Sequence, residues 1–179
     1  MTTILAGILS LAQYLKTLRE EPNDCRLKQC CHCGRAEPWH HGHYHRKADR
    51  SPSPNASLNP IPILRFFCPE CRHTSSVLPE CIPPRRWYLW DLQQAIFLTI
   101  LAGQSLYAAA QSVIPSYHTI HRWIRRFKDR FQCHKETLIQ AVSSLGITQS
   151  FIDFWQAVLH LFSLGHAMRL CHVAGILIP

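Results

Sequence analysis

Two cysteine pairs are the residues of this chain best suited to chemistry. Cys30 and Cys33 form one Cys-x2-Cys motif, and Cys68 and Cys71 form a second one further along the chain. Each motif can place two thiolates on one tight turn, and two such turns supply the four soft ligands of a closed tetrahedral zinc site. The spacing therefore predicts one structural Zn²⁺ held by these four cysteines.

Neighbouring residues leave the identity of the ligands open. Cys25, Cys31 and His32 lie beside the first pair and could replace one of its members, although the two-residue spacing favours Cys30 with Cys33. Free thiols in a core are the alternative to a metal. A catalytic zinc would need an open position and a general acid/base, and the deaminase order of His-x-Glu before Pro-Cys-x-x-Cys does not occur.

A run of histidines over residues 40–45 is the second candidate for metal binding. In an extended strand His41, His43 and His45 would share one face, and Tyr44 would lie on the other. We interpret this run as a solvated, partly cationic strand, with a metal site as the alternative.

Residues 105–127 have the pattern of two helices joined by a tight turn. Ala109 and Ala110 permit close helix packing, Pro115 stops the first helix, and Ser116 can cap the second. Apolar residues recur along the second helix at positions i, i+3, i+4 and i+7, which predicts a buried stripe. The stripe consists of Ile120, Trp123, Ile124 and Phe127.

The rest of this second helix carries the candidate DNA-binding residues. A recognition helix in a major groove needs early polar side chains for base edges and later basic ones for phosphates. Arg122 is our first choice for a bidentate contact to guanine, and a merely solvated helix face is the alternative. The candidates are His118, Thr119, His121, Arg122, Arg125, Arg126 and Lys128. Residues that could extend the phosphate contact, or be ordinary surface, are Arg35, Arg85 and Arg86.

Charge and composition favour a polyanionic partner. The 179 residues carry a net charge of +8, with 47% hydrophobic and 17% charged residues, a balance typical of a globular chain. Residues 30–86 hold eight basic against four acidic side chains, and residues 87–135 hold six against two. Double-stranded DNA is therefore the first partner to expect. The N-terminal apolar run is too short for a membrane span and lacks signal-peptide features, so we expect a cytoplasmic protein whose clustered cysteines bind metal.

The elements that must position these residues give an α+β fold class, in which a small β zinc ribbon precedes a mostly helical domain with the helix-turn-helix. We expect an N-terminal amphipathic helix (1–24), the zinc ribbon (25–84), the helix-turn-helix (85–135) and a C-terminal helical segment (136–179). The predicted helices and strands are Ile4–Leu18, His40–Lys47, Ile61–Phe67, His73–Leu78, Trp87–Leu101, Ser105–Val113 and Ser116–Phe131. Two or three small helices should follow, with breaks at Gly146, Gly165 and Gly175.

In combination, these motifs resemble those of small zinc-ribbon/helix-turn-helix proteins of bacterial mobile elements, which are similar to the N-terminal DNA-binding part of ISL3-type insertion-sequence transposases. The resemblance covers roughly residues 25–130 and is carried by the two Cys-x2-Cys motifs, the Pro84-Arg85-Arg86 turn and the Thr119-to-Trp123 segment. It implies zinc binding and duplex DNA binding linked to transposition. Arg72 departs from it, because a glycine usually follows the second cysteine pair.

No catalytic role is expected. A transposase that uses Asp, Asp and Glu needs three carboxylates on a large sheet to hold two metal ions. After the helix-turn-helix only Asp129, Glu136 and Asp153 remain, on predicted helices. The chain would therefore act as a recognition subunit.

The alternatives are a protein–protein adaptor and a truncated remnant of a transposase. Residues 151–164 are apolar on nearly all sides, so they should be buried in the chain's own core, or against a transposase partner or a second copy. We favour the chain's own core.

Overall fold

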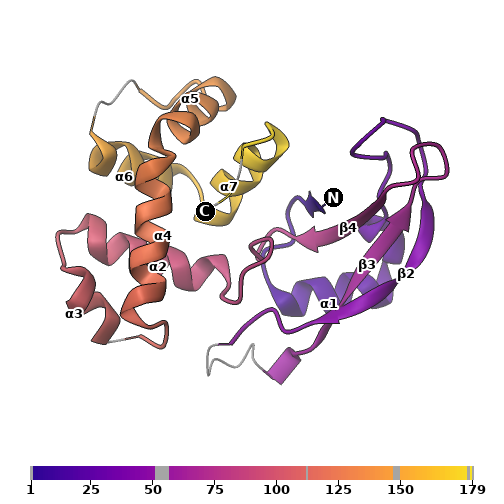
Figure 1. Cartoon of the computed structure of the whole chain (residues 1–179), viewed down its shortest axis with the longest axis horizontal. Helices are drawn as coiled ribbons and strands as arrows, with labels where there is room; N and C mark the ends of the chain where they lie inside the picture. Colours follow the sequence, from indigo (N-terminus) through magenta and orange to yellow (C-terminus); the bar gives the residue numbers. More distant parts are fainter. Residues whose placement is uncertain (1, 51–56, 112, 147–149, 177, 179) are drawn as a thin grey trace. The chain divides into compact units, whose positions relative to one another are not determined.

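The computed structural model describes residues 2–50, 57–111, 113–146, 150–176 and 178. They form a mixed α+β structure, as predicted, with a four-stranded sheet in the N-terminal part and helices after it (Figure 1). The chain divides into two compact units, Met1–Leu89 and Trp90–Pro179. The four segments expected from the sequence thus join into two, because the first helix packs on the sheet and the last helices pack on the helix-turn-helix.

The N-terminal unit is built around a mixed sheet with strand order β1-β4-β3-β2. The β2, β3 and β4 strands form antiparallel pairs, and β1 lies parallel to β4. Its elements are β1 (Thr2–Leu5), α1 (Leu11–Glu20), the short 3-10 helix η1 (Pro22–Cys25), β2 (Trp39–Arg46), β3 (Ile61–Phe67) and β4 (Thr74–Pro79).

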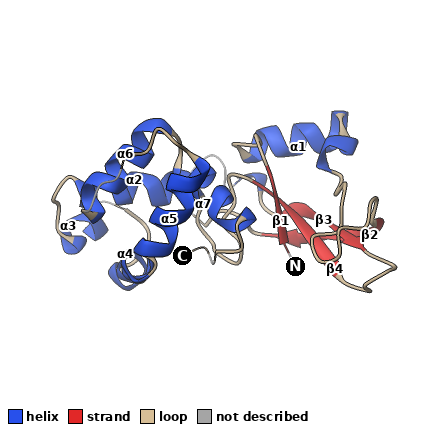
Figure 2. Cartoon of the chain, turned by 90° about the horizontal axis from the view of Figure 1, so that it is seen from above, coloured by secondary structure: helices blue, strands red, loops and turns tan. Residues whose placement is uncertain are grey.

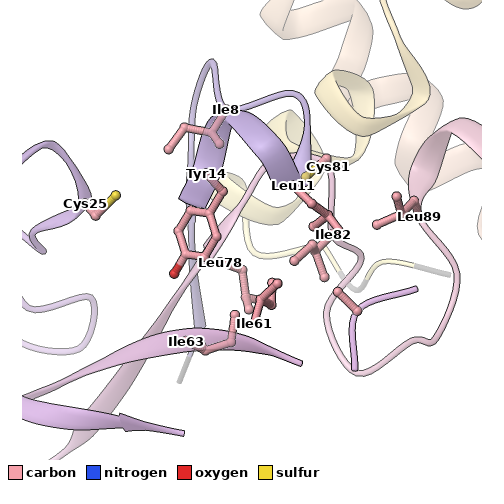
Figure 3. Packing of buried hydrophobic residues seen from close by; sticks show 11 residues of the cluster. Ile8, Leu11, Tyr14, Cys25, Ile61, Ile63, Leu78, Cys81, Ile82 and Leu89 are labelled. Atoms are coloured by element: carbon pink, nitrogen blue, oxygen red, sulfur yellow. The ribbon is translucent and has the colours of Figure 1, made fainter. Parts of the chain in front are cut away.

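Helix α1 lies across one face of this sheet (Figure 2). Its buried residues Leu11 and Tyr14 meet Ile61, Ile63 and Leu78 of the sheet in the core of the unit (Figure 3). The Tyr14 hydroxyl donates a hydrogen bond of 3.0 Å to the backbone oxygen of Pro62. Burial of these apolar side chains stabilises the sheet on which both cysteine pairs depend.

The predicted N-terminal helix over Ile4–Leu18 is wrong in its first half. Residues 2–5 instead form β1, and the helix begins only after Ser10, whose side chain accepts the Gln13 N–H at 3.1 Å. The Gln13 side chain in turn accepts the Leu9 N–H at 2.8 Å. This reciprocal arrangement resembles a capping box and starts the helix at Leu11.

The C-terminal unit contains six helices in the part of the chain that is described. They are α2 (Trp90–Leu101), α3 (Leu106–Gln111), α4 (Tyr117–Asp129), α5 (Phe131–Ala141), α6 (Phe151–Leu161) and α7 (Leu164–Val173). The predicted break at Gly165 is wrong, because Gly165 is buried within α7 and Ser163 caps that helix by accepting the His166 N–H. The predicted start of the next helix at Trp87 is also wrong, because α2 begins only at Trp90. Trp87 belongs to the N-terminal unit, where its carbonyl accepts the Arg50 N–H.

An aromatic cluster forms the centre of the C-terminal unit. The rings of Phe97 and Phe127 stack with centroids 4.7 Å apart, and the Trp155 ring meets both edge-on at 5.5 Å and 5.3 Å. The apolar segment of α6 therefore packs in the chain's own core. It is not buried on all sides, however, since Ile152 and Leu161 are 45% and 47% exposed.

None of the described helices combines the length and apolar character needed to cross a membrane.

Candidate metal centre and exposed basic helix

A short hairpin presents the first cysteine pair. Gln29 and Ala36 form an isolated antiparallel bridge, and the Cys30 N–H donates to the Arg35 carbonyl at 2.8 Å. The Gly34 N–H closes the turn by donating to the Cys30 carbonyl at 2.9 Å. Gly34 has a φ of +75°, a left-handed conformation that glycine adopts without a steric penalty.

The turn between β3 and β4 presents the second pair. The Cys68 N–H donates to the His73 carbonyl at 2.9 Å, so the turn continues the pairing of the two strands. Arg72 follows Cys71 with a φ of +57°. The departure at Arg72 noted from the sequence therefore keeps the left-handed turn that glycine would favour, and it leaves both cysteines facing the first pair.

The structure brings the four predicted ligands into one cluster. The Cys30 and Cys71 sulfurs are 3.6 Å apart, as are those of Cys33 and Cys68, and all four lie within 4.8 Å of one another. Four sulfurs at 2.3 Å from a central ion would form a tetrahedron with edges of about 3.8 Å. The cluster can therefore hold a metal ion, and its donor set and spacing fit one held by thiolates alone.

Hydrogen bonding and burial give these thiols different pKa values. Burial opposes ionisation of Cys30, but the N–H groups of Cys33 and His32 and the adjacent thiols favour its thiolate and lower its pKa to about 6. Burial and hydrogen bonds to the neighbouring thiols raise the pKa of Cys71 to about 12. A divalent cation would replace the protons that otherwise limit the negative charge of the cluster.

Cys25, Cys31 and His32, the other candidate ligands near the first pair, lie outside the cluster of four cysteines. Cys25 at the end of η1 is fully buried and belongs to the apolar core cluster of the N-terminal unit. The Cys31 sulfur lies 3.0 Å from the Ser75 hydroxyl. The His32 ring stacks on that of His73 at 3.9 Å. These two histidines and Cys71, which also belongs to the cysteine cluster, form a second group of three side chains close enough together to hold a metal ion. The sequence analysis had not singled out His73.

The histidine strand differs from its predicted pattern because of a β-bulge. The register between β2 and β3 shifts between His40 and His43, where Gly42 has a φ of +72°. A bulge reverses the alternation of side chains beyond it. His43 and His45 therefore share a face with His40 rather than with His41, and their rings lie 5.1 Å apart.

Helix α4 has the two-sided character predicted for it. Its predicted stripe of Ile120, Trp123, Ile124 and Phe127 is buried. Among the remaining candidates, five are exposed and two are partly buried. The exposed residues are His118, His121, Arg122, Arg125 and Lys128, and the partly buried ones are Thr119 and Arg126.

Local contacts order parts of this exposed surface. Arg125 forms an ion pair of 3.6 Å with Asp129, and the Arg122 side chain donates to the His118 carbonyl at 3.3 Å. The Tyr117 ring stacks on His121 with centroids 5.9 Å apart. Ser116 precedes the helix as predicted, but its hydroxyl lies 3.2 Å from that of Thr119 and does not cap a backbone N–H.

Residues 30–123 match the sequence pattern of a domain of unknown function, DUF6431. This match covers just over half of the 179 residues. The chain belongs to the DUF6431 family. The DUF6431 region begins at the first cysteine of the cluster and ends within α4, so it includes all four clustered cysteines and most of the helix-turn-helix.

No curated protein and no solved structure is significantly similar to this DUF6431 chain.

Proposed function

We propose that this protein is a zinc-stabilised DNA-binding protein that recognises duplex DNA through α4. The observation that carries the proposal is the division of α4 into a buried apolar stripe and an exposed basic surface. Thirteen helical residues span about 20 Å, enough to follow a major groove for part of a turn. The exposed histidines lie in the first half of the helix and Lys128 near its end, the order that base reading and phosphate contact require.

Zinc is the metal that the cysteine cluster suits best. Four thiolates form a soft donor set that selects zinc or an iron–sulfur centre, and hairpins carrying Cys-x2-Cys motifs are typical of structural zinc sites. With all four positions taken by cysteine, the ion would link the first hairpin to the β3–β4 turn. It would thus support the fold, leaving no position for a substrate.

The proposed link to transposition depends on the resemblance to mobile-element proteins. In this role the protein would be a recognition subunit that binds element DNA while another chain performs strand transfer. The adaptor alternative finds some support in the exposed apolar side chains of α6, Ile152 and Leu161. It predicts capture of a transposase without DNA affinity.

Selection of bound duplexes from a random library tests the main proposal. The unaltered protein should enrich a sequence motif, and Arg122→Ala should relax the preference at one or two base pairs at a cost of about 1–3 kcal/mol. Lys128→Ala should weaken binding to all duplex sequences alike. It should also reduce the slope of log K against log salt by the contribution of one phosphate contact. Lys16→Ala is the control, because Lys16 pairs with Glu20 on α1 of the other unit. Absence of duplex binding at low salt would disprove the proposal.

A further inference from the structure

A strongly cationic hollow lies within the N-terminal unit, separate from α4. It has a volume of about 450 Å³, within the range typical of ligand sites. Two segments distant in sequence form it, the end of β2 with the residues after it, and the turn before α2. Its lining residues are His45, Arg46, Lys47, Arg50, Arg85, Arg86 and Trp87. Five of these seven side chains are Lys or Arg, so a ligand in the hollow would meet a concentrated positive potential.

Arg46 joins the two segments. Its guanidinium donates to the Pro83 carbonyl at 2.8 Å and also to the Arg86 carbonyl. Burial lowers the pKa of this side chain, but arginine stays charged in proteins, so its charge is added to the hollow. Arg46 thus acts as a support that fixes the 83–86 turn against the strand.

Arg50 is held in place by an aromatic ring. Its guanidinium carbon lies 2.8 Å from the centroid of the Trp87 ring, and its backbone N–H donates to the Trp87 carbonyl at 3.1 Å. Arginine stacked on an aromatic face keeps its in-plane N–H donors available. A side chain held in this way loses less rotamer entropy when it binds a phosphate.

Arg85 occupies an unfavourable backbone conformation beside this stack. Its φ is +58°, although it is not glycine, and its side chain is exposed. A non-glycine residue in this region costs about 1 kcal/mol or more, a type of strain that gathers at binding sites. The acidic residue Asp49 precedes Arg50 in the sequence, but its side chain is buried and does not line the hollow.

We propose that this hollow is a second DNA contact, in which Arg50, Arg85 and Lys47 bind backbone phosphates of duplex DNA. The proposal rests on the proposed function. Phosphate oxygens match the planar donors of arginine, and backbone contacts fix the position of a protein on DNA without reading sequence. The β-module would then contribute affinity, and α4 would contribute specificity.

The salt dependence of duplex binding by the full-length, zinc-loaded protein tests this inference. Each phosphate contact contributes about 0.9 to the slope of log K against log salt. Arg50→Gln and Arg85→Gly should each make the slope shallower by about that amount. If the affinities converge at about 1 M salt, each should weaken binding about 15-fold at about 50 mM salt. The selected sequence motif should not change.

The variants are chosen to separate charge from folding. Glycine suits the left-handed backbone at position 85, so Arg85→Gly removes the guanidinium while relieving strain. Arg85→Lys restores a charge and should recover most of the affinity. Lys16→Ala is again the control, with a single exposed charge removed elsewhere on the unit. Equal zinc content in every variant would confirm that the module is intact.

Three outcomes would overturn the inference. If Arg50→Gln and Arg85→Gly leave the salt slope unchanged while α4 variants still bind DNA more weakly, the hollow does not contact DNA. The proposed function of α4 would not be affected by that result. Saturable binding of AMP or inorganic phosphate that Arg85→Gly abolishes, together with an unchanged duplex slope for the same variant, would assign the hollow to a small phosphate ligand instead. If the unaltered protein does not bind duplex DNA at low salt, both the proposed function and the proposed contact in the hollow are wrong.

Discussion

Gly34 and Arg72 occupy equivalent positions, each directly after the last cysteine of its pair, and each has a positive φ, +75° and +57° respectively. The two turns thus share a backbone conformation although only one has the residue that favours it. Both lie next to the cysteine cluster, so the backbone strain energy at these two positions affects the turns that hold the four thiols together.

Replacing these two residues should have opposite effects. Arg72→Gly relieves about 1 kcal/mol or more of left-handed strain and loses about 0.5–1 kcal/mol through the freer unfolded chain, so it should be neutral or slightly stabilising. Gly34→Ala adds about 1–2 kcal/mol of left-handed strain and recovers about 0.5–1 kcal/mol through the stiffer unfolded chain, so it should destabilise by about 0.5–1 kcal/mol, although the added methyl group has no neighbour within 4 Å. Urea unfolding of the zinc-loaded protein measures both.

The control for this pair is Gly146→Ala. That position has equal free space around the added methyl group but no positive φ. If Gly146→Ala lowers the free energy of unfolding as much as Gly34→Ala does, the left-handed turn conformation is not the cause of the destabilisation at Gly34.

Removal of one predicted ligand should release the metal. Cys68→Ser should reduce bound zinc from one ion per chain toward none, because a serine hydroxyl is a poor zinc ligand and three sulfurs leave the site open. Cys31→Ser and Cys133→Ser should keep a full ion, since Cys31 contacts Ser75 and Cys133 lies exposed on α5. Elemental analysis of purified protein gives the result. Zinc that is retained in Cys68→Ser, or lost in Cys31→Ser, would change the ligand assignment.

Alkaline pH should destabilise the C-terminal unit through Cys171. Burial raises the pKa of this thiol to about 12, against an ordinary value of about 9 in an unfolded chain. Because the folded pKa is the higher one, the stabilisation is fully present below pH 9 and is lost as the pH rises toward 12. Unfolding free energy measured across this interval should fall less steeply in Cys171→Ala than in the unaltered protein.

A thiol-reactive probe gives an independent measure. At pH 9 the exposed Cys133 should react quickly and Cys171 only on unfolding. Equal rates at the two cysteines would contradict the buried environment of Cys171.

Loss of one ring from the aromatic cluster should destabilise the helical unit without changing the metal content of the protein. Phe127→Ala removes a fully packed side chain that touches Phe97 and Trp155, at a cost of about 3–5 kcal/mol. Tryptophan fluorescence in a urea titration should report the loss, while zinc content stays at one. Tyr107→Ala, which removes a ring that is 67% exposed, should change stability by less than about 0.5 kcal/mol. A joint loss of zinc in Phe127→Ala would show that the units fold as one.

Local patterns explain which expectations were confirmed. The predicted limits of β3, Ile61–Phe67, agree with the structure, because alternating β-formers between loop residues define a strand locally. The buried stripe of α4 was also predicted, since a period of 3.6 residues determines which side chains share a face. The Ser10–Gln13 pair could have revealed the true start of α1, because a capping box is a signal carried by the sequence itself.

The sequence by itself determined the cysteine pairs and the amphipathic helix of the helix-turn-helix, because each depends on residues a few positions apart. It also determined the basic charge, which depends on composition alone. Only the tertiary structure decided the rest. Strand β1 exists because it pairs with β4 some seventy residues later, and the bulge at Gly42 moves the histidines to a different face. The cationic hollow joins residues 45–50 to residues 85–87, and this approach depends on the folded sheet and on Arg46. Contacts between distant segments follow from packing of the whole unit, which no local pattern specifies.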